Sequence, residues 1–88
     1  MDALVNGSEL VLRDMAVGES GRITGFRAGA SAYRRKLLAL GLTKGAAFRV
    51  TRVAPLGDPV EITVRGFSLS LRRDEAEIVL VARDTPEA

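Results

Sequence analysis

Residues 54–71, APLGDPVEITVRGFSLSL, decide the fold class because they predict a β-hairpin in a single register. With Arg65-Gly66 as a two-residue turn, six apolar side chains fall on one face of the ribbon in three facing pairs: Val64 with Phe67, Ile62 with Leu69, and Val60 with Leu71. The four polar side chains between them fall on the other face. Because a slip of one residue would exchange the two faces, the alternation and the turn support the same pairing.

Three more segments have the pattern of short strands. Residues 21–26 and 47–53 precede the hairpin, and the apolar residues 78–81 follow it. In the second segment the inward alternation breaks at Arg52, which predicts a β-bulge or an early exit of the strand from the core. We therefore expect an all-β fold with one short inserted helix, arranged as a small, strongly bent barrel of about five strands.

The inserted helix is expected over residues 32–40, with Ser31 as its N-cap. Gly41 suits the left-handed position that follows a helix. Contact between Leu42 and Leu37 would then complete a Schellman cap.

One face of this helix is expected to pack in the core. At about 100° per residue, the side chains of Tyr33, Leu37 and Leu40 lie close together and form the predicted buried stripe. Leu38 points away from them, beside Arg34. We favour a position under a neighbouring loop for Leu38 over an exposed one.

The two ends of the chain set the expected domain boundaries. Residues 1–8 and 85–88 are expected to be flexible tails, so that a single domain spans residues 9–84. The N-terminal residues have an acidic second position and lack the apolar core of a signal peptide or a membrane span. We therefore expect a soluble intracellular protein.

Charge is distributed unevenly along the chain. The formal net charge is +2, with 13 basic and 11 acidic residues. Residues 22–73 carry a net charge of +9, whereas the segments before and after them carry −3 and −4. This asymmetry predicts an acidic partner surface, nucleic acid or anionic lipid, unless the acidic ends fold over the basic middle and neutralise it.

The chain contains neither cysteine nor histidine, which limits its chemistry. The usual ligands of zinc, copper and most iron sites are missing, and so are Ser-His and Cys-His nucleophiles. Asp74, Glu75 and Glu77 lie in a predicted turn, where carboxylates are normally solvated. Residues 41–45, GLTKG, lack the spacing of a phosphate-binding loop. We expect no enzyme activity, no cofactor, no metal site and no nucleotide bound by this chain alone.

Nucleic-acid binding has less support than the charge suggests. Arg34, Arg35 and Lys36 could meet phosphates, but a solvated helix face is the commoner interpretation of such a run. Tyr33 and Phe67 are assigned to the core, which leaves no stacking platform for bases. We do not expect nucleic acid to be the main partner.

Several motifs in order and spacing resemble the FeoA family, the ferrous iron transport protein A. The resemblance covers about residues 12–81 and rests on five features: Gly18 and Gly21, the helix end RRKLLALGLTKG at 34–45, the turn APLGDPVE at 54–61, the Arg65-Gly66 turn, and Ser70-Leu71-Arg72. It implies an SH3-like barrel and a cytoplasmic, non-enzymatic accessory protein that modulates Fe(II) uptake by contact with the FeoB permease, whose cytoplasmic part is a G protein. The chain would meet the membrane only through that permease. The resemblance sets no oligomeric state.

Two groups of side chains are the predicted partner contacts. They belong to the proline-flanked turn, which is rigid and therefore costs little to order on association, and to one helix face. These residues are Leu56, Gly57 and Asp58 in the turn, and Arg34, Arg35 and Leu38 on the helix.

Other roles remain open for these residues and for the chain. Asp58 could organise the turn before Pro59, and Leu56 could plug the end of the barrel. Because the same domain occurs in iron-dependent repressors, a regulatory domain of that type is an alternative, as is a basic barrel that binds nucleic acid. Weak metal sensing through carboxylates is a third.

Overall fold

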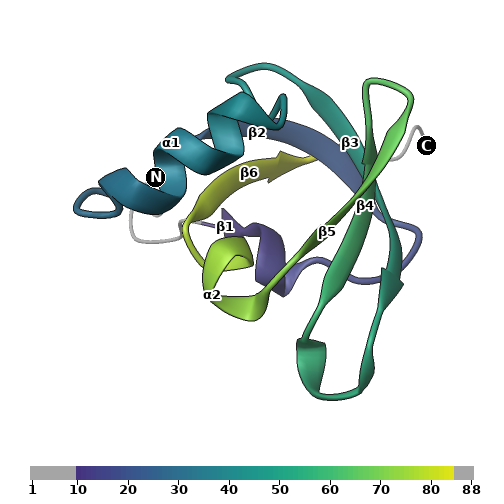
Figure 1. Cartoon of the computed structure of the whole chain (residues 1–88). Coiled ribbons are helices and arrows are strands. Elements are labelled where there is room, and N and C mark those ends of the chain that lie inside the picture. Colours follow the sequence, from purple (N-terminus) through teal and green to yellow (C-terminus); the bar gives the residue numbers. More distant parts are fainter. Residues whose placement is uncertain (1–9, 85–88) are drawn as a thin grey trace, which may run out of the picture.

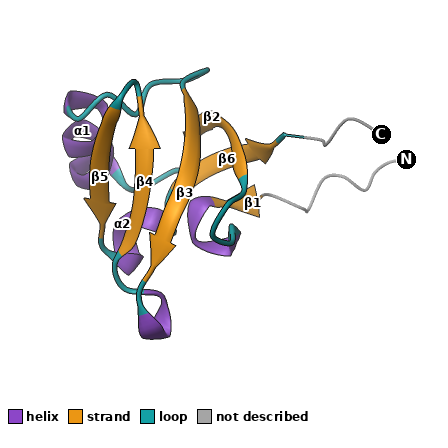
Figure 2. Cartoon of the chain, turned by 90° about the vertical axis from the view of Figure 1, so that its right-hand side faces the viewer, coloured by secondary structure: helices purple, strands orange, loops and turns teal. Residues whose placement is uncertain are grey.

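The strands of the computed structural model, which describes residues 10–84, form one antiparallel sheet in the order β1-β6-β2-β3-β4-β5 (Figure 1). The elements in chain order are β1 (Leu10–Val11), the 3-10 helix η2 (Leu12–Asp14), β2 (Ser20–Phe26), α1 (Ser31–Ala39), β3 (Ala47–Val53), the 3-10 turn η3 (Pro55–Gly57), β4 (Val60–Val64), β5 (Phe67–Leu71), α2 (Arg73–Ala76) and β6 (Val79–Arg83). The sheet curls around one apolar core, with α1 and α2 beside its open edges (Figures 1 and 2). The expected tails, 1–8 and 85–88, lie outside the described residues.

The expected all-β class with a short inserted helix is confirmed, and the strand count is six rather than about five. The additional strand is β1, in which Leu10 faces Val81 and Val11 faces Leu80 of β6. A segment of two residues is too short to show an alternating pattern in the sequence. It is a strand only because it pairs with β6.

The β4–β5 hairpin has the predicted register. All the facing pairs from Val60 with Leu71 to Val64 with Phe67 are formed. Arg65 and Gly66 both have positive φ, 53° and 85°, as a tight two-residue hairpin turn requires. Phe67 is 56% exposed, so its expected place in the core is wrong. It lies beside the turn on an edge strand, where no further strand covers it.

The predicted bulge in β3 is also present. Val50 faces Ile62, whereas Arg52 faces Glu61, so Thr51 is the extra residue. The hydroxyl of Thr51 donates a hydrogen bond to the carbonyl of Glu61 at 3.1 Å. Strict alternation after Val50 would direct Arg52 into the core. The bulge leaves Arg52 exposed while the strand stays paired.

Helix α1 ends in the predicted Schellman cap. The amide of Leu42 donates to the carbonyl of Leu37 at 3.1 Å, the amide of Gly41 donates to that of Leu38 at 3.0 Å, and Gly41 has φ 102°. Leu37 and Leu42 are fully buried, so the cap is also where the helix joins the core. The helix begins at Ser31 itself, so Ser31 is not the N-cap; that position is Ala30, which makes no side-chain cap.

Only Leu37 of the expected helix stripe is buried. Tyr33 and Leu40, which were expected in the core, are 40% and 38% exposed, and Leu38, which was expected under a loop, is 39% exposed. These three expectations are wrong because Leu37 is the one residue of α1 whose side chain reaches the core. The rest of the helix runs along the outside of the sheet (Figure 1).

A buried carboxylate joins α1 to α2. Glu75 is 3% exposed, so its expected place in a solvated turn is wrong. Its carboxylate accepts hydrogen bonds from the Lys36 ammonium at 2.5 Å and from the Arg72 amide at 2.9 Å. Burial raises the pKa of Glu75, but these bonds and the charges of Lys36 and Arg72 outweigh it, so that the pKa is lowered overall.

The hairpin turn holds the segment that follows the same, C-terminal, end of α1. Arg65 Nε donates to the carbonyl of Gly41 at 3.3 Å, and its Nη2 donates to Thr43 Oγ1 at 2.7 Å. The C-terminal end of α1 is therefore held by polar contacts from α2 and from the hairpin, in addition to the buried side chains of Leu37 and Leu42.

The Glu75 contacts predict a specific dependence of stability on pH. Because folding lowers the pKa of Glu75, its stabilising contribution is present above the ordinary glutamate pKa of about 4.3 and is lost as the pH falls through the lowered value. Glu75→Gln should lower the free energy of unfolding by about 1–3 kcal/mol at pH 7, and this difference should shrink towards pH 3. Urea denaturation across that range measures it.

Asp74→Asn is the matched control, since Asp74 precedes Glu75 in α2 but is exposed and, within residues 10–84, has no hydrogen bond or ion pair. It should have little effect at any pH. An equal stability loss for Glu75→Gln at pH 3 and pH 7 would contradict the account.

Strands β2 and β6 approach each other closely at Gly21. A Cβ at Gly21 of β2 would collide with the carbonyl oxygen of Ala82 in β6, which is backbone and cannot swing away. Gly21→Ala should lower the free energy of unfolding by about 1–3 kcal/mol in chemical denaturation. Thr24→Ala, an exposed change on the same strand, is the control; similar stability of the two variants would refute the close approach.

Candidate functional site

The turn between β3 and β4 presents an exposed leucine on a closed loop. The loop is closed by hydrogen bonds from the Ala54 amide to the Pro59 carbonyl at 3.1 Å and from the Gly57 amide to the Ala54 carbonyl at 2.9 Å. Leu56 at its tip has φ 71°, a left-handed conformation that costs a residue with a Cβ about 1–2 kcal/mol. Its side chain is 91% exposed, so Leu56 does not plug the end of the barrel.

Asp58 braces this turn against the start of α2. Its Oδ1 accepts a hydrogen bond from the Arg73 amide at 3.2 Å and lies 3.3 Å from Arg72 Nε. These contacts match the interpretation in which Asp58 organises the turn. Leu56 is therefore held out in solvent by a supported loop.

The predicted helix residues line two hollows on the outer side of α1. Ser31, Arg34, Arg35 and Leu38 surround the first, of about 230 Å³. Arg34 and Leu38 also line the second, of about 320 Å³, together with the end of β2 and Lys44. Because the hollows share two residues, we treat them as one surface, the α1 groove, lined by Thr24, Gly25, Phe26, Ser31, Arg34, Arg35, Leu38 and Lys44.

The predicted contacts form two separate surfaces, one at the turn of residues 56–58 and one on helix α1. Helix α1 and the turn between β3 and β4 lie at opposite ends of the molecule in both views (Figures 1 and 2). The sequence did not predict Phe26 and Lys44 as parts of the groove, because the fold alone brings the end of β2 beside α1. Lys44 had a weak signal, since it continues the basic run just after the helix.

The basic middle of the chain is mostly unneutralised. Among residues 10–84 the acidic end segments reach only one cation of this block, where Glu75 pairs with Lys36. The other ion pairs join Arg13 to Glu77, Arg83 to Glu19, and Arg72 to Asp58. Within this part of the chain, the acidic ends therefore do not cover the basic surface.

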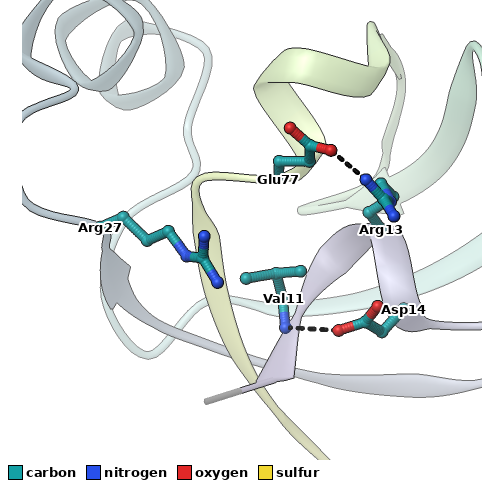
Figure 3. Close-up of a pocket in the computed structure, with 5 residues that line it drawn as sticks. All are labelled: Val11, Arg13, Asp14, Arg27 and Glu77. Atoms are coloured by element: carbon teal, nitrogen blue, oxygen red, sulfur yellow. Dashed lines mark hydrogen bonds and ion pairs between the residues drawn. The ribbon is translucent and has the colours of Figure 1, made fainter.

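A third hollow, of about 230 Å³, lies between η2, the end of β2 and the start of β6 (Figure 3). Arg13 is paired with Glu77, and Asp14 Oδ2 accepts a hydrogen bond from the Val11 amide at 3.4 Å. Arg27 extends from the opposite side towards Val11 (Figure 3). Two cations and two carboxylates leave this pocket without net charge, so it is the weaker candidate for a charged partner.

Between residues 10 and 84, no three carboxylates are grouped so that they could hold a metal ion together. No helix of that region is long and apolar enough to cross a membrane.

Known structures resemble this chain over most of its length. A FeoA protein from Chlorobium tepidum is 37% identical, with a TM-score of 0.77 over 90% of this chain and 74% of that one. A FeoA-like protein from Clostridium acetobutylicum is 29% identical, with a TM-score of 0.80 over 91% of this chain and 92% of that one.

A third similar structure is that of a protein described as having an SH3 domain. The zinc complex of FeoA from Stenotrophomonas maltophilia, described as a prokaryotic SH3 domain protein, is 26% identical, with a TM-score of 0.72 over 83% of this chain and 89% of that one. A manganese-dependent transcriptional repressor has the same fold in part of its chain, with a TM-score of 0.79 over 85% of this chain and 36% of that one. Its identity of 14% shows the fold alone.

The SH3-like class expected from the resemblance is thus confirmed. Residues 10–83 match the FeoA domain, which is most of the chain and nearly all of the described structure. The chain belongs to the FeoA family.

Proposed function

We propose that this chain is a cytoplasmic, non-enzymatic accessory protein of ferrous iron transport that acts by binding the cytoplasmic domain of a FeoB-type permease. Family membership supports the link to iron uptake. The observation that carries the contact mechanism is Leu56, a 91% exposed leucine kept in a left-handed conformation on a braced loop.

Two unfavourable features coincide at Leu56. An exposed leucine gains nothing from the hydrophobic effect, and its backbone conformation stores strain that glycine would avoid. Strained residues that the surrounding structure holds in place occur mainly at functional sites. Burying this side chain in a partner would recover about 1.5–3 kcal/mol, and the closed loop has little conformational entropy left to lose.

The turn predicts a clear binding phenotype. Leu56→Ala should weaken binding to the permease's cytoplasmic domain by about tenfold or more, because the buried apolar area is lost, while Leu56→Met should retain most of it. Calorimetric titration with and without guanine nucleotide measures the effect. The unfolding free energy of Leu56→Ala should stay within about 0.5 kcal/mol of the wild type, since the side chain packs on little.

Phe67→Ala is the matched control, because it removes an exposed apolar side chain beside the β4–β5 turn, which lies at the opposite end of β4 from Leu56. It should leave affinity almost unchanged. Absence of wild-type binding to the cytoplasmic domain and to the intact permease, in either nucleotide state, would overturn the proposal.

The residue composition predicts that the chain acts by contact and carries no iron itself. Without histidine or cysteine, its side chains offer Fe(II) only oxygen ligands and two thioethers. An anaerobic Fe(II) titration followed by NMR should show weak, unsaturated line broadening spread over surface carboxylates. Saturable broadening at one cluster of residues with one equivalent of iron would support the metal-sensing alternative instead.

A further inference from the structure

The α1 groove has a positive charge that the described residues do not compensate. Arg34, Arg35 and Lys44 line it, and none of them forms an ion pair within residues 10–84. Helix α1 contains no acidic residue, and the carboxylate that reaches it from α2, Glu75, is occupied by Lys36 on another side of the helix.

The groove also has an apolar floor. Leu38 is 39% exposed and lines both hollows, and the half-buried Phe26, which packs against the core, lines the second. Ligand pockets for whole small molecules measure about 300–1,000 Å³. One hollow, of about 230 Å³, lies below this range and the other, of about 320 Å³, lies at its lower limit, so each suits a single side chain better than a whole small molecule. A ligand that only carried phosphates would leave Leu38 uncovered, whereas a peptide with acidic and apolar side chains would satisfy both features.

We propose that the α1 groove binds an acidic segment of the protein partner, whose carboxylates pair with Arg34, Arg35 and Lys44 and whose apolar side chain packs on Leu38. The identity of that partner as the permease rests on the function proposed above. Since helix α1 and the β3–β4 turn lie at opposite ends of the molecule (Figures 1 and 2), the acidic segment is a second contact, separate from the pocket of the partner that receives Leu56.

Three synthetic peptides test the chemistry of the groove on the full isotope-labelled chain. One alternates glutamate with leucine, the second replaces glutamate by glutamine, and the third replaces leucine by serine. Only the first should bind measurably, and its amide shift changes should be confined to residues 24–26, 31–38 and 44. Equal binding of the glutamine peptide, or shifts centred elsewhere, would overturn the proposal.

Charge reversal at two matched arginines tests the site. Arg34→Glu should weaken binding of the glutamate–leucine peptide by about tenfold, as expected for losing charge-assisted hydrogen bonds. Arg49→Glu changes the net charge equally, at an exposed β3 residue outside the groove, and should weaken binding less than about twofold. Equal losses for both variants would show general charge attraction and overturn the site.

Other occupants of the groove have distinct outcomes. Tighter binding of a single-stranded oligonucleotide than of the peptide, with the same amide shifts, would assign the groove to nucleic acid. A dimer of the chain that Arg34→Glu dissociates would assign it to a second copy. Either result contradicts the peptide assignment.

The permease titration separates this inference from the proposed function. If Arg34→Glu binds the cytoplasmic domain as tightly as the wild type while Leu56→Ala does not, the groove inference fails and the function stands. If the wild type does not bind the permease, the function fails, and the peptide titrations alone decide the chemistry of the groove.

Discussion

The single register of the β4–β5 hairpin is the constraint on which the rest of the structure depends. It directs Val60, Ile62 and Val64 into the core and leaves Glu61 and Thr63 outside. Its tip supplies Arg65, which holds the end of α1, and its first strand directly follows the closed loop that exposes Leu56. A slip of one residue would bury the polar face and move both candidate surfaces, so fold and function depend on the same pairing.

The features predicted correctly from the sequence are those set by local chemistry. Tight turns, period-2 alternation, the bulge near Arg52 and the Schellman cap at Gly41 each depend on residues close together in the chain. The errors concern burial, which depends on distant neighbours. Tyr33 and Leu40 have helical spacing but remain exposed, and the buried Glu75 pairs with Lys36, which is far away in the sequence.

The same distinction applies to the candidate surfaces. Leu56 and the basic helix face were predicted as partner contacts, from the proline-flanked turn and from the run of basic residues, and both are exposed in the structure. Their separation was not predictable, because the sequence contains no measure of where α1 lies relative to the β3–β4 turn. Leu38 in the floor of the α1 groove was predicted, but Phe26 was missed, since it joins the groove only through the position of β2 beside the helix.

The central claim is that this member of the FeoA family works through two protein-contact surfaces at opposite ends of its barrel. Hydrogen–deuterium exchange of the full chain, alone and with the cytoplasmic domain of a FeoB-type permease, tests it most directly. The account predicts slower exchange of amides within residues 55–58 and 31–38, with the paired amides of β3 and β4 unchanged. Unchanged exchange throughout residues 10–84 in the presence of that domain would contradict it.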